Sequence, residues 1–310
     1  MSDVAEVALT PAATRAGLAR SLLLALRPKQ WAKNILVGAA PLAAGELLSF
    51  STAGRVLLLF IALSCASSAG YLINDVRDRD YDRAHPRKRL RPIASGALGV
   101  PVALAAAAAL AFIALALAAT CSLQAGMLTG CYLALTLVYS VWLKRVPGVE
   151  MVIVSAGFLL RAVIGGVATG TNLSEWFLAV ICAASLLVVS GKRVAEMRRL
   201  DGAAMEPAVA QRGVLHSYSA GYLRAIASMA AGIAVAAYIA WVLLVGMRRG
   251  SAMLTAASVA PLTAAVGRYL HVVNAGGGES PEDALLDDKV MLAFGAGWLV
   301  LFGASLASAL

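Results

Sequence analysis

The chain contains few charged, aromatic, histidine and cysteine residues, and these scarcities exclude several classes of protein. Charged residues make up 14% and aromatic residues 6% of its 310 residues, whereas an ordinary soluble domain carries about 25% charged residues. The three histidines and four cysteines lack metal-ligand spacing, and the sequence contains no Ser/His/Asp arrangement or glycine-rich nucleotide loop. The cysteines, which fall within or beside apolar segments and are expected to be packing residues, are Cys65, Cys121, Cys131 and Cys182. The scarcity of charge predicts an integral membrane protein.

Long apolar runs dominate what is present. Hydrophobic residues make up 60% of the chain, and runs of roughly 17–25 apolar residues are long enough to cross a hydrocarbon core about 30 Å thick. The fold class that this pattern predicts is an all-α integral membrane protein with about nine transmembrane helices. The predicted spans are residues 34–50, 54–73, 98–119, 124–143, 149–169, 175–191, 220–246, 251–270 and 289–309. The first is the weakest, because Pro41, Gly45 and Glu46 interrupt it.

The net charge of +9 is distributed unevenly between the two sides of these spans. If the N-terminus is cytoplasmic, Arg55, Arg248 and Arg249 lie outside the cell and Arg161 lies within a span, while all the other Lys and Arg residues fall on the cytoplasmic side. This asymmetry is typical of the positive-inside rule and predicts a cytoplasmic N-terminus and an external C-terminus. The positive charge therefore indicates a membrane lipid surface as partner and no nucleic acid.

The N-terminal region differs from the rest of the chain. Residues 13–29 place Leu18, Leu22 and Leu26 on one helical face, which predicts an interfacial helix before the first span. The chain accordingly divides into a cytoplasmic N-terminus with this helix, residues 1–33, and a transmembrane domain, residues 34–310.

Four aspartates follow the second span, in the sequence Asn-Asp-Val-Arg-Asp-Arg-Asp-Tyr-Asp. If the helix continues, Asp75, Asp78 and Asp82 share one face, whereas Asp80 lies off it. Aligned carboxylates repel one another unless a cation offsets their charge. Clustered oxygen ligands suit Mg²⁺, which keeps several waters and bridges one or two carboxylates to substrate phosphates. We therefore predict that these three aspartates and Asn74 form a magnesium site, with Asp75 and Asp78 as the catalytic pair; a solvated, charged loop is the alternative.

A basic cluster follows the aspartates directly, and its members are Arg83, Arg87, Lys88, Arg89 and Arg91. Acidic ligands followed by basic residues describe a site for a magnesium-bound diphosphate, in which Lys and Arg hold the remaining phosphate oxygens. A location at the membrane surface implies one diphosphate substrate and one lipid co-substrate. The sequence offers no obvious general base, which fits an acceptor that is already an anionic nucleophile, such as a lipid phosphate.

Each of three further polar segments is either part of the substrate site or has a purely structural role. Lys29 and Lys33 share a helical face and, with Trp31 between them, are either acceptor ligands or a lipid-headgroup anchor. Arg161 lies too deep in its span to reach the surface, so we expect it to face a polar cavity. The third segment ends the sixth span, where snorkelling and a helical ion pair are the alternative to donor binding; its polar residues are Lys192, Arg193 and Glu196.

The segment before the last span also contains acidic residues. Ser280 is predicted to be a helix N-cap, Pro281 the first helical residue, and Glu282 and Asp283 an acidic first turn. A role for Asp283 or Asp287 in the chemistry is the alternative.

The Asn74–Asp82 motif together with nine spans resembles the UbiA superfamily of intramembrane prenyltransferases. Several other segments, taken together, resemble a branch of that superfamily that transfers phosphoribose, and they are residues 27–34, 74–96, 161–166, 191–196 and 280–283. The similarity runs from about residue 20 to the end of the chain. It implies a UbiA-like bundle around a cytoplasm-facing cavity in the plasma membrane, with Mg²⁺ as cofactor.

The resemblance also implies a reaction, in which 5-phosphoribose passes from phosphoribosyl diphosphate (PRPP) to decaprenyl or another polyprenyl phosphate, for synthesis of a cell-wall arabinan precursor. The donor ligands implied are Lys88, Arg89, Arg91, Lys192, Arg193 and Glu196, and the acceptor ligands are Lys29, Lys33 and Arg161. Prenyl-diphosphate users usually carry a second Asp-rich motif where this chain has Lys192, Arg193 and Glu196. An extra cationic subsite makes physical sense for a donor with an additional 5-phosphate. A homo-oligomer is left open.

Two alternatives remain. One is a UbiA-type prenyltransferase that acts on an aromatic acceptor. The other is a small-anion or lipid transporter, which should show inverted repeats and broken helices that meet at mid-membrane; neither is clear in the sequence.

Cysteine labelling tests the predicted orientation. In Arg87→Cys the new thiol should react only from the cytoplasmic side, and in Asn172→Cys only from outside, because the charge distribution places these loops on opposite faces. The reverse pattern would overturn the orientation.

Overall fold

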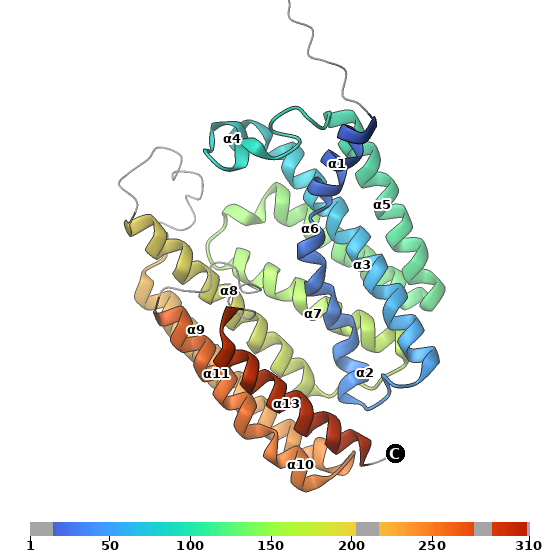
Figure 1. Cartoon of the computed structure of the whole chain (residues 1–310), viewed down its shortest axis with the longest axis vertical. Helices are drawn as coiled ribbons and strands as arrows, with labels where there is room; N and C mark the ends of the chain where they lie inside the picture. Colours follow the sequence, from blue (N-terminus) through green and yellow to red (C-terminus); the bar gives the residue numbers. More distant parts are fainter. Residues whose placement is uncertain (1–14, 203–216, 276–286, 309–310) are drawn as a thin grey trace, which may run out of the picture.

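The computed structural model describes residues 15–202, 217–275 and 287–308, and this part of the chain is helical with no strand (Figure 1). The elements, with η for 3-10 helices, are α1 Arg15–Leu26, η1 Pro28–Gly38, α2 Ala39–Ala43, α3 Phe50–Arg77, α4 Arg79–Ala84, η2 Lys88–Leu90, α5 Val100–Cys121, α6 Leu123–Val141, η3 Leu143–Arg145, α7 Val149–Thr169, α8 Glu175–Gly202, α9 Ala220–Leu244, η6 Gly246–Arg248, α10 Ala252–Ala257, α11 Val259–Asn274 and α13 Lys289–Ala307. The all-α class predicted from the sequence is confirmed.

The predicted count of nine spans is not confirmed. Seven helices in the described part are long and apolar enough to cross a membrane, namely α3, α5, α6, α7, α8, α9 and α13. The other two predicted spans are built from shorter pieces. Residues 34–50 contain the end of η1, the five-residue α2 and a turn, while residues 251–270 are divided between α10 and α11.

Local sequence explains both interruptions. After α2, Gly45 adopts a φ of 76°, and the Glu46 N–H donates to the Pro41 carbonyl, which closes the turn before α3. Pro261, the third residue of α11, lacks the N–H that a helix continuing from α10 would need, so α10 ends at Ala257 and a new helix begins at Val259. The segment from α1 through η1 to α2 nevertheless runs from one end of the bundle to the other (Figure 1).

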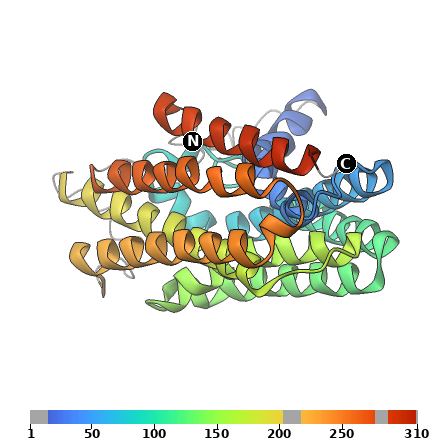
Figure 2. The ribbon, with the colours of Figure 1, turned by 90° about the horizontal axis from the view of Figure 1, so that it is seen from below.

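Two of the clusters of buried side chains join most of the apolar helices. One cluster joins η1, α3, α5, α6 and α7, and the other joins α7, α8, α9, α11 and α13. Helix α7 contributes to both, with Ile164 in the first and Met151 in the second. The view from below shows these helices lying roughly side by side along the bundle (Figure 2). Helix α7 therefore connects the two halves.

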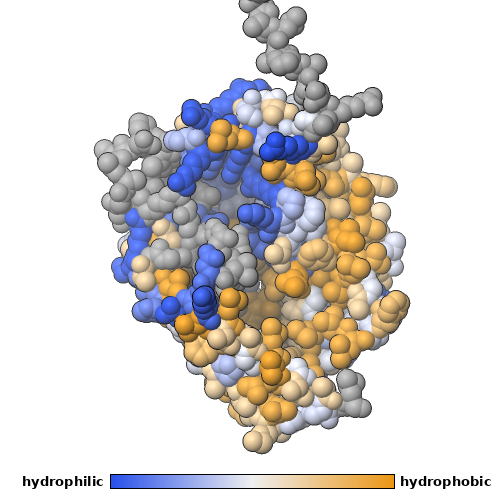
Figure 3. All heavy atoms as spheres, in the orientation of Figure 1, coloured by the Kyte–Doolittle hydropathy of each residue, from blue (hydrophilic) through white to orange (hydrophobic). Residues whose placement is uncertain are grey.

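Helix α1 covers the polar end of the first half. Leu18, Leu22 and Leu26 pack against a buried cluster that includes Ala69 and Leu72 of α3, so the predicted apolar face is present and is used for packing. The position of this helix at the membrane surface stays a prediction. Hydrophilic residues gather at the end of the molecule that carries α4, while the lower part of the same face is mostly hydrophobic (Figure 3).

Candidate active site at the polar end of the bundle

The aspartate motif lies where α3 ends and α4 begins. Helix α3 ends at Arg77 and α4 begins at Arg79, and Asp78 between them has φ −90° and ψ 6°. The continuous helix expected from the sequence is therefore interrupted at Asp78. The Asp82 N–H still donates to the Asp78 carbonyl at 2.8 Å, which keeps the helical direction. Asp75 and Asp82 are consequently buried, whereas the side chain of Asp80 is 91% exposed.

An arginine joins the two buried carboxylates. Arg91 Nη1 lies 2.7 Å from Asp82 Oδ2 and 3.2 Å from Asp75 Oδ1, so one nitrogen contacts both aspartates. Arg27 Nη2 lies 2.6 Å from the same Asp75 oxygen, and its guanidinium stacks over Tyr71 at 4.9 Å from the ring centroid. Arg27 and Arg91 thus offset the charge of Asp75. Another cation would be needed at Asp75 to displace the two arginines.

A lysine that the sequence analysis counted only toward membrane orientation completes the site. Lys144, in η3, places its Nζ 2.6 Å from Asp78 Oδ1 and 3.4 Å from Asn74 Oδ1. The four predicted metal ligands are therefore divided into two pairs: Lys144 bridges Asn74 and Asp78, and Arg91 bridges Asp75 and Asp82. The sequence feature that could have identified Lys144 as a site residue is its position, because it follows the fourth predicted span on the same side of the membrane as the aspartates.

The electrostatic environment of Asp82 shows why cations are needed here. Burial raises the pKa of the Asp82 carboxyl, the ion pair and hydrogen bond with Arg91 oppose that rise, the nearby charge of Asp75 adds to it, and Lys88 opposes it. Arg91 and Lys88 therefore offset part of the cost of burying the Asp82 carboxylate.

The predicted basic cluster is only partly brought to the carboxylates. Arg91 contacts them directly and Lys88 lies near enough to act on Asp82. Arg89 is exposed. The turn that positions these residues is closed by His85, whose Nδ1 accepts hydrogen bonds from the backbone N–H groups of Arg87 and Lys88. This local bond gives His85 a structural role.

Arg193, predicted to bind the donor, is occupied by two glutamates. Its Nε and Nη2 donate to the two carboxylate oxygens of Glu150 at 2.8 and 2.5 Å, and Nη1 donates to Glu196 at 2.5 Å. Glu150 is fully buried at the start of α7. The bidentate pair joins α7 to α8, and the neighbouring Lys192 is half-buried. Donor binding by Arg193 and Lys192 stays a prediction.

Arg161, predicted to bind the acceptor, is buried with each of its nitrogens in a hydrogen bond. Nε donates to Asn34 Oδ1 at 2.8 Å, Nη2 to the Tyr132 hydroxyl at 2.7 Å, and Nη1 to the Gly157 carbonyl at 2.7 Å. Its guanidinium also lies over the rings of Tyr132 and Phe158. Its partners belong to the protein, and they come from η1, α6 and α7.

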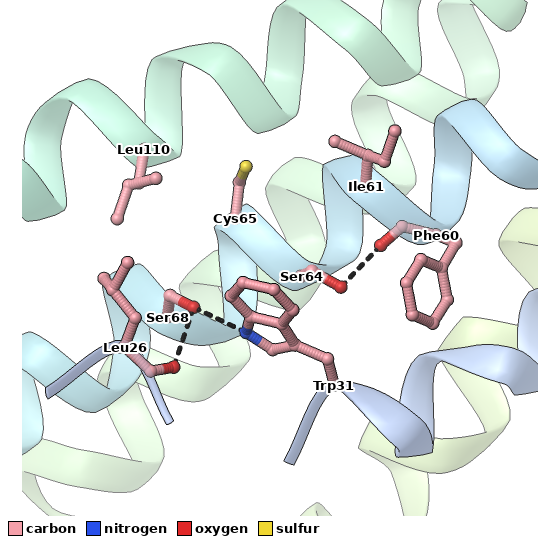
Figure 4. Close-up of a pocket in the computed structure, with 8 residues that line it drawn as sticks. All are labelled: Leu26, Trp31, Phe60, Ile61, Ser64, Cys65, Ser68 and Leu110. Carbon is pink, nitrogen blue, oxygen red and sulfur yellow. Dashed lines mark hydrogen bonds between the residues drawn. The ribbon is translucent and has the colours of Figure 1, made fainter. Parts of the chain in front are cut away.

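The two lysines predicted to share a helical face lie on a 3-10 helix instead. In that geometry residues three apart are aligned, and Lys33 Nζ accordingly bonds Gln30 Oε1 at 2.5 Å. Lys29 is exposed. Between them Trp31 Nε1 donates to Ser68 Oγ at 3.0 Å, beside an apolar pocket (Figure 4). That pocket is lined by Leu26, Trp31, Phe60, Ile61, Ser64, Cys65, Ser68 and Leu110.

The predicted Ser280–Asp283 helix start lies outside the described residues. Within the described residues, Asp288 caps α13, because its Oδ1 accepts hydrogen bonds from the N–H groups of Val290 and Met291. Those bonds, with Arg268 at 2.9 Å, lower the pKa of the Asp288 carboxyl.

The donor set at the end of α3 suits a hard divalent cation. It consists of one amide oxygen and three carboxylates, and in each pair the oxygens already lie within reach of a single cationic nitrogen. Among the described residues no three Asp, Glu, His or Cys side chains lie close enough to hold a metal together. Mg²⁺ requires only one or two carboxylates when water and substrate phosphates supply its other ligands.

Comparison with known proteins identifies the family. The model of the UbiA prenyltransferase family matches residues 34–295, and the chain belongs to that family. It is 41% identical to a decaprenyl-phosphate phosphoribosyltransferase of Corynebacterium glutamicum, over 91% of this chain and 85% of that protein. It is 38% identical to a protein of the same name from Mycobacterium tuberculosis, over 94% of this chain and 96% of that one.

Solved structures confirm the fold. A UbiA homolog from Archaeoglobus fulgidus bound to GPP and Mg²⁺ matches with a TM-score of 0.68 and 17% identity, over 93% of this chain and 99% of that one. The apo structure of a UbiA homolog from Aeropyrum pernix matches with a TM-score of 0.61 and 22% identity, over 91% and 98%. The fold is therefore that of the UbiA family, as the sequence analysis expected.

The Arg193 pairing leads to a stability prediction. Removing one partner of a buried ion pair costs about 3–5 kcal/mol, because the other charge stays buried. Arg193→Ala should therefore lower the apparent Tm of the detergent-solubilised protein by several degrees. The control is Arg224→Ala, since Arg224 is exposed and bonds the Ala220 carbonyl of its own helix. An unchanged Tm with a raised donor KM would instead make Arg193 a donor ligand.

Proposed function

We propose that this protein transfers the 5-phosphoribosyl group of phosphoribosyl diphosphate to decaprenyl or another polyprenyl phosphate and releases diphosphate. The observation that carries the proposal is the convergence of three cations, Arg27, Arg91 and Lys144, on the aspartates that follow α3. Identities of 38–41% to two decaprenyl-phosphate phosphoribosyltransferases, over nine-tenths or more of this chain, support the substrate class. The active site faces the cytoplasmic side of the plasma membrane, and the product serves the synthesis of cell-wall arabinan.

The chain's own residues fit the two anionic substrates. One or two of the carboxylates of Asp75, Asp78 and Asp82, with the Asn74 amide beside Asp78, would hold Mg²⁺. The bound ion would neutralise the leaving diphosphate. Arg27, Arg91 and Lys144 pair with those carboxylates, and they would be available to bind phosphate oxygens if another cation offset the charge of the aspartates. Lys88 and Lys192, which are half-buried, and Arg89, which is exposed, are the further cations proposed to bind the donor.

The acceptor requires no base from the protein. A lipid phosphate oxygen is already anionic, so it attacks the anomeric carbon as the bond from that carbon to the diphosphate oxygen breaks. Lys29 and Lys33 lie on η1, directly after Arg27, and would receive the lipid headgroup beside the donor site. Trp31 of η1 also lines the apolar pocket, whose other walls come mainly from α3 (Figure 4).

Substitution of the aspartates tests the site. Asp75→Asn and Asp78→Asn should each lower activity by several orders of magnitude, because each removes charge from the metal and diphosphate site. Asp80→Asn is the matched control, since Asp80 belongs to the same motif but is exposed. Initial rates with purified variants of equal Tm measure the effect. Equal losses at Asp75 and Asp80 would contradict this assignment.

Donor identity tests the reaction. With decaprenyl phosphate as acceptor, the purified protein should release diphosphate from phosphoribosyl diphosphate, and a chelator should abolish that release until Mg²⁺ is restored. A prenyl diphosphate should give no product with either a lipid phosphate or an aromatic acceptor. Transfer from the prenyl diphosphate alone would establish the alternative prenyltransferase, and failure with every donor would sink both enzyme assignments.

A further inference from the structure

Segment η1 has an unusual conformation for its length. It forms an eleven-residue 3-10 helix, whereas runs longer than three or four residues are uncommon because the hydrogen-bond geometry is poor. Its first cap, Arg27, has a φ of 55° and is the one non-glycine residue of the described chain with positive φ. Contacts from elsewhere in the fold must therefore hold this segment in place.

Asn34 is the main point of attachment. Its side chain is fully buried; Oδ1 accepts from Arg161 Nε at 2.8 Å and from Ser67 Oγ at 3.4 Å, and Nδ2 donates to Ser64 Oγ at 3.1 Å. Both halves of the amide are therefore fixed, by α7 on one side and α3 on the other. Ser67 also contacts the Tyr132 hydroxyl, which closes the network.

Arg161 holds this network from α7. Its remaining nitrogens bond the Tyr132 hydroxyl and the Gly157 carbonyl, and within the described chain no carboxylate pairs with it. One helical turn further along α7, Gly165 gives η1 a second contact. A Cβ at Gly165 would lie 1.9 Å from the Val37 carbonyl oxygen, so the backbones of α7 and η1 touch there.

We propose that Arg161 is a positioning residue that acts through Asn34 and η1 to hold Arg27 against Asp75, rather than a ligand of the acceptor. Arg27 precedes η1 and contacts Asp75 at 2.6 Å, while Asn34 lies within the same segment. Displacement at Asn34 is transmitted along η1 to the donor site. The enzymatic readouts rest on the proposed function, whereas the spectroscopic readout below does not.

The first test follows the tryptophan on η1. The protein is labelled with 5-fluorotryptophan, and the signal of Trp31, one of five tryptophans, is assigned by its loss in Trp31→Phe. Arg161→Gln and Gly165→Ala should both shift this ¹⁹F resonance, because Trp31 bonds Ser68 from η1. Gly166→Ala is the matched control, since its Cβ would meet the movable end of the Leu173 side chain. An unmoved Trp31 resonance in Arg161→Gln would overturn the proposal.

The second test separates positioning from acceptor binding by kinetics. Arg161→Gln should raise the KM for phosphoribosyl diphosphate about tenfold, as expected for one lost charged contact, and change the KM for decaprenyl phosphate less than about twofold. In an Asn34→Ala background the same substitution should have almost no further effect, because it acts through Asn34. Gly165→Ala should raise the donor KM without removing the buried charge, so it carries the test if Arg161→Gln does not fold. A rise confined to the acceptor KM, or additive effects with Asn34→Ala, would overturn the proposal.

Discussion

The neutralisation of Asp75 is the interaction on which the candidate site depends. This carboxylate is 3% exposed at the end of a membrane-length helix, where an unpaired charge would be costly. Arg27 reaches it from the N-terminal segment and Arg91 from the loop after α4. Both segments are therefore fixed against α3 by the same oxygen, and the polar end of the bundle is built around it.

The need to pair a buried charge also explains two other ion pairs. Asp78 pairs with Lys144, and Glu150 pairs with Arg193 through two hydrogen bonds. These two pairs differ in what they offer to a ligand. Lys144 and Asp78 are partly exposed, so another cation can separate them, whereas Glu150 is fully buried and Arg193 nearly so. The first pair suits exchange with substrate, and the second suits a permanent joint between α7 and α8.

Helix α7 carries much of this organisation. Glu150 near its start holds α8, Arg161 in its middle holds Asn34, and Gly165 allows the close approach of η1. Arg161 is a charged residue inside a span, which is a signal for function in membrane proteins. The sequence predicts that Arg161 faces a polar cavity, whereas in the structure each of its nitrogens bonds a polar group of the protein.

Much of the fold followed from the sequence alone, because hydrophobic length and helical periodicity are local properties. The all-α membrane class, the apolar face of α1 and the separation of Asp80 from Asp75 and Asp82 were all accessible from residue spacing. The aspartate motif and the segments around it also carried the family resemblance. The two spans that did not form continuous long helices contain proline or glycine, whose local effects outweigh overall hydrophobicity.

Only the tertiary structure decided which charges meet. Arg27 and Asp75 are 48 residues apart, and Lys144 and Asp78 are 66 apart, so no local pattern links them. The 3-10 conformation of η1, which separates Lys29 from Lys33, likewise depends on contacts with α3 and α7. The sequence by itself determined where charge occurs along the chain, whereas the packing of distant helices determined which charges are satisfied within the protein. Pairing depends on distances in space, and these are set by the whole bundle.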